Sequence, residues 1–279
     1  MKSRLTPILI LPLAVGIFFN IEASAWLTAQ TPPRQPSPPR RQSSPSTPQR
    51  QPRQRSPQTR NLPTVTRLSF TLPPKGAPGN REGAAGRDSC TVVGKPPLTA
   101  LVPGTNIGLT IAERPTFWFY VPYQANPRIP VEFSLTDDRE NTVYKATFQL
   151  TATPGIVGIN LPQNTPGLEI GKSYRWELKI VCDPANLREF ESVDGAVERV
   201  QLDESLKQKI ERVNGRDRIL LYAENGLWYD TLTNLIELRR QNPQDAQLTK
   251  DWEDLLRQSP DIVLDKVVAQ PVVSCCTPR

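Results

Sequence analysis

Residues 168–182 read LEIGKSYRWELKIVC, and in the second half of this stretch apolar and polar side chains alternate. A period of two is typical of a strand that buries one face. Eight other runs with strand character lie on either side of it, at residues 67–72, 98–102, 107–112, 116–121, 131–136, 142–150, 156–161 and 193–201. Pro, Gly and Asn separate these runs at intervals of about ten residues, which is the rhythm of a β-sandwich. We therefore predict a sandwich domain over residues 61–201.

The corner LEIGKSY, residues 168–174, resembles the turn before strand F in fibronectin type III and immunoglobulin-like domains. In those domains a Tyr hydroxyl bonds back to the upstream backbone. Cys90 departs from the pattern, because it precedes the first central strands and so does not reproduce the usual disulfide between the sheets. The expected fold class is α+β: mainly an immunoglobulin/fibronectin-like sandwich, followed by a small C-terminal helical unit.

The hydrophobic period changes after residue 201. Leu206, Ile210 and Val213 recur at helical spacing behind Asp203, which is a suitable N-cap. Further helices are expected at residues 219–224, 227–241 and 245–258. The helical unit then covers residues 202–258, and a tail follows at residues 259–279.

The expected second and third helices resemble a tetratricopeptide helix pair. The residues that carry this resemblance are Tyr222, Gly226, Trp228, Thr231, Leu235 and Leu238, with Pro243 after the end. Thr231 replaces the usual Ala, and only about one and a half repeats fit, whereas a free-standing array needs about three. The helical unit is therefore expected to pack on the sandwich as a brace. A partner surface formed by Trp228, Leu232 and Leu235 is the functional alternative.

The N-terminus has the features of an export signal over residues 1–25. Residues 5–19 are almost wholly apolar behind Lys2 and Arg4, and small residues at 23–25 suit cleavage after Ala25. Cleavage would leave no stable membrane span, while a retained signal would act as an anchor. The expected location is the periplasm or the cell exterior.

Residues 26–60 form a Pro/Arg/Gln-rich linker that is expected to be disordered. The formal net charge of the chain is +6, and residues 31–60 carry seven arginines and no acid. Residues 1–30 add +1, which leaves −2 on residues 61–279, so we do not expect the folded region to bind nucleic acid. The linker can act as a spacer, or it can contact an anionic cell-wall polymer.

Four cysteines occur in a chain that is expected to be exported, where disulfides are permitted. Cys90 and Cys182 flank the β region and are the preferred pair. For the adjacent Cys275 and Cys276 three outcomes stay open: free thiols, pairing between chains, or a bond that closes a small ring.

Residues 73–90, PPKGAPGNREGAAGRDSC, alternate glycines with cations. The run has neither the Gly-Lys-Ser/Thr ending of a P-loop nor the βαβ surroundings of a dinucleotide fingerprint. An anion-binding nest is one interpretation, with the residues Gly79, Arg81, Gly83 and Arg87. The preferred interpretation is an irregular segment that lies along the sandwich.

The chain contains no histidine, which excludes Ser-His-Asp and Cys-His nucleophiles and every zinc site that needs imidazole. We predict no catalytic set, no metal site and no cofactor. Carboxylates remain available for hydrolytic chemistry at Glu113, Glu132, Asp183 and Glu198, but no motif brings two of them together.

Several runs taken together resemble a cyanobacterial family, domain of unknown function 928. They are GAPG and REG between residues 76 and 83, LTALVP, ERPTFWFYVP, PGIVGINLP, SYRWELKIVCDP and LYAENGLWYD. The resemblance covers residues 67–265. It implies an exported protein and the same architecture, and it supplies no catalytic residues.

Three functional hypotheses follow. The first is a non-enzymatic periplasmic or cell-surface module that binds a protein partner. The second is a polysaccharide or cell-wall binding module, in which the aromatic run at residues 116–121 is exposed for stacking on sugars. The third is a carboxylate-based hydrolase.

Overall fold

The computed structural model describes residues 66–83, 92–126, 128–183, 186–257, 262 and 264–278. Residues 61–279 belong to one compact unit. The export signal, the linker, Cys90 and Arg87 lie outside the described residues, and the side chain of Cys182 is not described. The signal and the Cys90–Cys182 bond therefore stay predictions.

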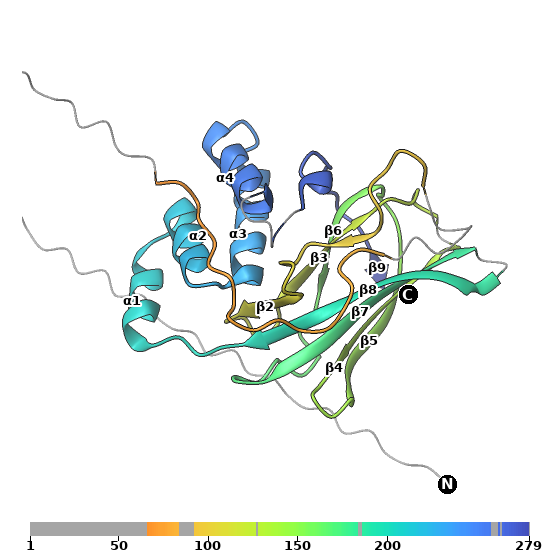
Figure 1. Ribbon diagram of the computed structural model, residues 1–279, viewed down its shortest axis with the longest axis horizontal. Helices are drawn as coiled ribbons and strands as arrows, with labels where there is room; N and C mark the ends of the chain where they lie inside the picture. The colour runs from red at the N-terminus through yellow and green to blue at the C-terminus, as the bar shows by residue number, and fades with distance from the viewer. Residues whose placement is uncertain are drawn as a thin grey trace, which may run out of the picture. The chain divides into compact units, whose positions relative to one another are not determined.

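The described part contains two β-sheets (Figure 1). The smaller sheet has the strand order β1 (Thr99–Ala100), β3 (Thr116–Val121) and β6 (Gly155–Asn160). The larger has the order β2 (Ile107–Thr110), β8 (Asn186–Arg199), β7 (Ser173–Asp183), β4 (Pro130–Thr136), β5 (Thr142–Gln149) and β9 (Thr277–Pro278). The β2–β8 pair is parallel, and the other pairs are antiparallel. The α+β class, mostly β, is confirmed.

The helices are α1 (Glu204–Arg212), α2 (Gly215–Glu224), α3 (Trp228–Gln241) and α4 (Ala246–Arg257), followed by the short 3-10 turn η1 (Asp265–Val267). The Asp203 carboxylate accepts the N–H of Leu206 at 2.9 Å and so caps α1, as predicted. Gly226 joins α2 to α3 with a φ of +71°, a left-handed conformation that glycine adopts without steric cost.

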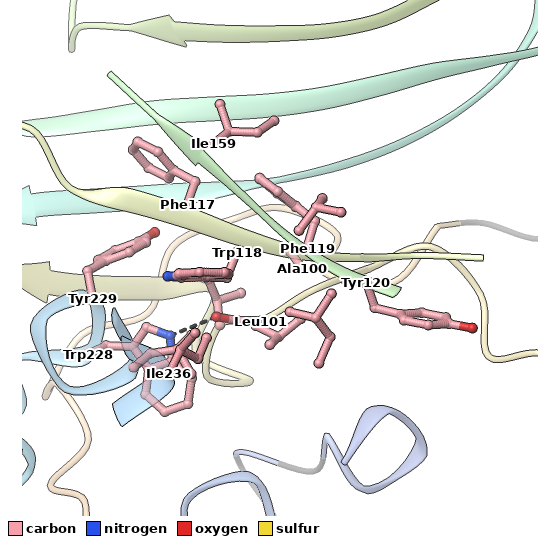
Figure 2. Close-up of a cluster of buried hydrophobic side chains, with 14 of the residues drawn as sticks. Ala100, Leu101, Phe117, Trp118, Phe119, Tyr120, Ile159, Trp228, Tyr229 and Ile236 are labelled. Atoms are coloured by element: carbon pink, nitrogen blue, oxygen red, sulfur yellow. Dashed lines mark hydrogen bonds between the residues drawn. The ribbon is translucent and has the colours of Figure 1, made fainter. Parts of the chain in front are cut away.

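Strand β3 is buried on both faces, which explains why its sequence TFWFYV is apolar throughout. On one face the ring of Phe117 lies 5.0 Å from that of Phe133 in the larger sheet. On the other face the indole N–H of Trp118 donates to the Thr233 hydroxyl of α3 at 3.0 Å. Figure 2 shows Phe117 and Trp118 on opposite sides of the strand. Trp118 and Tyr120 are only 5% and 0% exposed, so this aromatic run is core and offers no face for sugar stacking.

Helix α3 fastens the helices to the sheets. The Trp228 indole N–H donates to the carbonyl of Leu101 at 2.7 Å, drawn as a dashed line in Figure 2. The exposed fraction is 0% for each of Trp228, Leu232 and Leu235. These three side chains therefore belong to the core and cannot form the partner surface that the helical pattern allowed. One buried cluster runs through both sheets and helices α2, α3 and α4, so the helical unit braces the β region.

The corner before β7 contains the expected tyrosine interaction. The backbone N–H of Glu169 donates to the hydroxyl oxygen of Tyr174 at 3.0 Å. This bond fixes the turn at residues 168–174, from which Ile170 projects with half of its surface exposed. The immunoglobulin-like topology itself stays a prediction.

The strand expected at residues 67–72 is wrong. This segment has no regular secondary structure and joins neither sheet. The Thr71 N–H donates to the carbonyl of Ala223 at 3.0 Å, and the ring of Phe70 packs 5.0 Å from that of Trp228. Because its backbone donor satisfies the C-terminal end of α2, the segment binds the helices instead of extending a sheet.

The C-terminal segment covers an edge of each sheet. Beside β6, the Ile156 N–H donates to the Pro271 carbonyl at 2.7 Å, and the Val273 N–H donates to the Ile156 carbonyl at 2.9 Å. Farther on, β9 pairs with β5. Between these contacts Cys275 and Cys276 are joined by a disulfide, so the small ring is the outcome that the structure shows. Covering edge strands in this way limits pairing with other chains.

Candidate functional site

The described part of the glycine-rich run, residues 73–83, packs against carboxylates of the protein itself. The Asn80 N–H donates to Asp194 Oδ1 at 3.0 Å. A Cβ placed on Gly79, whose φ is +149°, would lie 2.8 Å from Asp194 Oδ2. The Arg81 guanidinium donates to the carbonyl of Ile262 at 2.9 Å. The donors at Asn80 and Arg81 are thus engaged within the fold, and Gly79 lies close against Asp194.

Gly83 is equally close to an internal carboxylate. A Cβ there would lie 2.5 Å from Glu191 Oε1. Glu191 is 5% exposed, it accepts a hydrogen bond from the Tyr123 hydroxyl, and burial raises the pKa of its carboxyl group. These contacts favour the irregular structural segment over an open anion nest, although Arg87 lies outside the described residues.

Two of the four candidate carboxylates lie far apart on the larger sheet. Glu132 of β4 pairs with Lys179 of β7, which pairs with Ser192 of β8. Glu198 lies six residues farther along β8, which is about 20 Å at about 3.3 Å per residue. Paired carboxylates of glycosidases are about 5–10 Å apart, so Glu132 and Glu198 do not form such a pair.

The other two carboxylates do not complete a hydrolytic pair either. Glu113 is exposed and forms ion pairs with Arg114 at 3.1 Å and Arg199 at 3.5 Å. The side chain of Asp183 lies outside the described part. Within the described residues, no group of three or more Cys, Asp or Glu side chains is placed to hold a metal ion.

A groove of about 640 Å³ lies between α1, α2 and the end of β8. Six of its twelve lining residues are apolar, and we call five of these the floor and the sixth, an exposed isoleucine, the rim. The residues that define this α1 groove are Ile111, Val200, Leu202, Ile210 and Tyr222 in the floor and Ile170 at the rim. Concave sites of about 300–1,000 Å³ that combine apolar side chains with polar groups are typical binding sites.

Few buried apolar residues support the α1 side of the groove. Ile210 is the one buried residue of α1, and with Tyr222 and Leu227 it forms a small cluster separate from the main core. Val200 and Leu202, on the segment that leads from β8 into α1, pack partly buried against this cluster. In Figure 1, α1 lies beside α2 at one end of the helical layer. One wall of the groove is therefore held by few apolar contacts.

Two arginines in the groove wall are committed to backbone carbonyls. The Arg199 guanidinium donates to Leu168 at 2.6 Å, and that of Arg218 donates to Val213 at 2.6 Å. These bonds fix the corner at residue 168 and the α1–α2 connection. They leave the charges of α1 itself, Glu204, Lys207 and Glu211, exposed along the rim.

A buried carboxylate lies behind the floor. Asp230 of α3 is 9% exposed and accepts the backbone N–H of Ile111 at 3.1 Å. Burial raises the pKa of Asp230 to about 6, and its hydrogen bonds offset only part of this effect. Asp230 thereby ties the floor at Ile111 to α3, and its charge depends on pH near neutrality.

Sequence reasoning did not find this groove. It singled out Ile210 as part of a helical period and Tyr222 as a tetratricopeptide position, but neither as a site residue. Ile111, Ile170 and Tyr222 come from three separate segments that only the folded chain brings together. The one local signal was the apolar Ile170 before Gly171 in a tight turn, where polar residues are usual.

The sequence model of the family described as Domain of Unknown Function (DUF928) matches residues 82–272, well over half of the 279 residues. The chain belongs to the DUF928 family. This confirms the family resemblance seen in the sequence, while cyanobacterial origin, export and the tetratricopeptide-like pair stay predictions.

The DUF928 match includes every residue that defines the α1 groove. A search of curated proteins finds no match to the chain. Among the described residues, no helix is both long enough and apolar enough to cross a membrane.

Proposed function

We propose that this DUF928 protein is exported to the periplasm or cell surface and acts there as a non-enzymatic interaction module. The α1 groove is the docking site for a partner protein in this proposal. The observation that carries it is the apolar floor of the groove together with Ile170, which is 50% exposed at the rim. The apolar N-terminal run and the small residues at 23–25 support export.

The floor and the rim favour a partner segment of amphipathic character. Apolar side chains of the partner would cover Ile111, Val200 and Ile170, and this burial contributes about 25 cal/mol per Å² removed from water. The exposed Glu204 and Glu211 flank Lys207 along α1, so basic residues at the edges of the segment would complement the rim. Grooves that receive an amphipathic helix work in this way.

Two finer fold assignments belong to the same proposal. The Tyr174 corner supports an immunoglobulin-like sandwich, and the α2–α3 hairpin around Gly226 supports a tetratricopeptide-like pair. Both are common scaffolds for protein binding, although a fold by itself does not define a function. The arginine-rich linker supports a further contact with an anionic cell-wall polymer.

Site-specific photo-crosslinking tests the proposal. A photoreactive residue is placed at position 170, and an identical one at Phe190, which is 45% exposed and does not line the groove. In a periplasmic extract the probe at 170 should give a discrete protein adduct, while the probe at 190 should not. The substitution Val200→Asp in the floor should reduce the adduct at least about tenfold. Adducts of equal yield from both positions, insensitive to Val200→Asp, would rule the α1 groove out.

A further inference from the structure

A second groove, of about 470 Å³, lies between the end of α3, helix α4 and the segment after η1. Its charged lining is dominated by arginine. Arg239, Arg240 and Arg257 line it together with a single acid, Glu253. We refer to it as the arginine groove, defined by these three arginines and Trp252.

Arg239 is held in place by an aromatic ring. Its guanidinium carbon lies 4.7 Å from the ring centroid of Trp252, which is 1% exposed and donates its indole N–H to the Val268 carbonyl at 2.9 Å. The guanidinium is thus stacked on a fixed platform. Burial lowers the pKa of Arg239, and the charge of Glu253 acts in the opposite direction. A half-buried cation of this kind is stabilised when an anion reaches it.

The arginines of this groove differ from other surface arginines in the described part of the chain. Within the described part of the chain, no ion pair is formed by Arg239, Arg240 or Arg257, even though several surface arginines elsewhere, such as Arg175 and Arg67, do form one. Cations in the last turn of a helix favour the helix dipole, which accounts for basic residues at the ends of α3 and α4. The dipole does not require three of them to line one groove.

Arg240 connects this groove to a second hollow of about 230 Å³. Its guanidinium lies 5.7 Å from the ring centroid of Trp118. The second hollow is lined by hydroxyl and amide groups, among them Thr116, Asn160 and Ser274. Arg240 lines both hollows, and the second also contains one carboxylate, that of Glu237. We refer to the two hollows together as the strip.

We propose that this strip binds an acidic polysaccharide, with uronate carboxylates on Arg239 and Arg257 and sugar hydroxyls in the hollow around Asn160. Guanidinium groups match carboxylates because the planar fork can donate two parallel hydrogen bonds. Hydroxyl and amide groups beside these guanidinium groups suit the hydroxyl-bearing faces of a sugar chain. This site is separate from the α1 groove and does not rest on its function.

Calorimetric titration of the full chain tests this site. The probes are a galacturonate hexamer, the neutral maltohexaose and the acidic peptide hexaglutamate. The double substitution Arg239→Gln with Arg257→Gln should weaken galacturonate binding at least about tenfold. The control Arg212→Gln removes an exposed arginine of α1 and should leave binding unchanged. All variants carry the same arginine-rich linker, so the difference between them reports the groove alone.

The outcomes separate clearly. Binding of galacturonate but not maltohexaose, lost in the double variant and kept in Arg212→Gln, supports the site. Equal binding of hexaglutamate would replace the sugar ligand by an acidic peptide and overturn the proposal. Unchanged galacturonate affinity in the double variant would also overturn it, because the linker would then carry all the binding. If the double variant melts early, Arg240→Gln, on an exposed side chain, provides the same comparison in a folded protein.

Discussion

Helices α3 and α1 both present apolar side chains to the rest of the protein, but they are anchored to very different degrees. The first half of α3 is almost wholly buried, and the indole N–H of Trp228, its first residue, donates to the backbone carbonyl of Leu101. α1 buries Ile210 alone, in a small cluster outside the main core. Segments with few buried apolar contacts open locally at low free-energy cost. We therefore expect α3 to stabilise the whole unit, and α1, which forms one wall of the groove, to open locally without unfolding the rest.

The largest expected effect is at the anchored helix. Trp228→Ala should lower the free energy of unfolding by about 3–5 kcal/mol, because it empties a core site and removes the bond to Leu101. Urea unfolding followed by circular dichroism measures this loss. As a matched control, Trp228→Phe keeps most of the apolar volume and should cost clearly less. A loss below about 1 kcal/mol for the alanine variant would mean that α3 is not the anchor.

Asp230 links α3 to Ile111 in the floor of the α1 groove, and its raised pKa makes the stability of the protein depend on pH. Because burial raises the folded pKa to about 6, above the usual value of 3.8, the folded state binds more protons between about pH 4 and pH 6. The free energy of unfolding attributable to this group is highest below pH 4, falls as pH rises through that window and is constant above it. The fall should be on the order of 3 kcal/mol, at about 1.4 kcal/mol for each unit between the two pKa values.

Asp230→Asn should remove this pH dependence while keeping an acceptor for the Ile111 N–H. The variant should therefore gain stability relative to the wild type as pH rises from 4 to 7, measured by urea unfolding at each pH. Asp251, fully buried but ion-paired with Arg216 at 2.6 Å, is the control position. Asp251→Asn should instead destabilise the protein at pH 7, because it leaves the guanidinium without its partner. Parallel pH profiles for the wild type and Asp230→Asn would show that Asp230 does not titrate near pH 6.

Local sequence patterns predicted much of the fold. Runs of alternating or continuous apolar residues indicated the strands, and an N-cap residue with apolar residues at helical spacing indicated the helices. The run at residues 116–121 became β3 with the same bounds, and Asp203 caps α1. The tail strand β9 was missed because two residues carry no period. Residues 67–72 alternate like a strand, yet they bind α2 through Thr71. The hydrophobic period of a segment predicts which of its faces is buried, but not which other element covers that face.

Neither groove could be predicted from the sequence. Trp228 was a candidate partner surface because a helical stripe looks the same whether the protein itself or a partner covers it. Here the ring of Phe70 and the backbone at Leu101 cover Trp228. The groove residues are dispersed in the sequence: Ile170 and Tyr222 line one groove from different segments, and Arg239 and Arg257 lie on different helices. Such sites depend on tertiary contacts between distant segments.

A smaller effect is expected at the loosely held helix. Ile210→Ala should cost about 2 kcal/mol, at the low end for such a truncation, because its cluster is small. Hydrogen exchange should show the loss of protection confined to α1 and its connections, with α3 unchanged. Leu206→Ala, on a half-buried neighbour in the same helix, is the control and should have a weaker effect. If protection falls equally in α3, the two helices unfold as one unit and α1 is not an independent wall.

The smallest effect should come from the cap of α1. Asp203→Ala removes the acceptor for the Leu206 N–H and should destabilise the start of α1 by about 1 kcal/mol. Since α1 contributes little to the main core, the global free energy of unfolding should change by less than this, while exchange at the first turn of α1 increases. Asp203→Asn is the matched control, because its side-chain oxygen can still cap the helix. If the alanine variant instead lowered global stability as much as Trp228→Ala does, α1 would be part of the anchored core, and the contrast between the two helices would fail. If it opens α1 locally, it should also weaken the crosslink from position 170, because the helix that it loosens forms the opposite wall of the α1 groove.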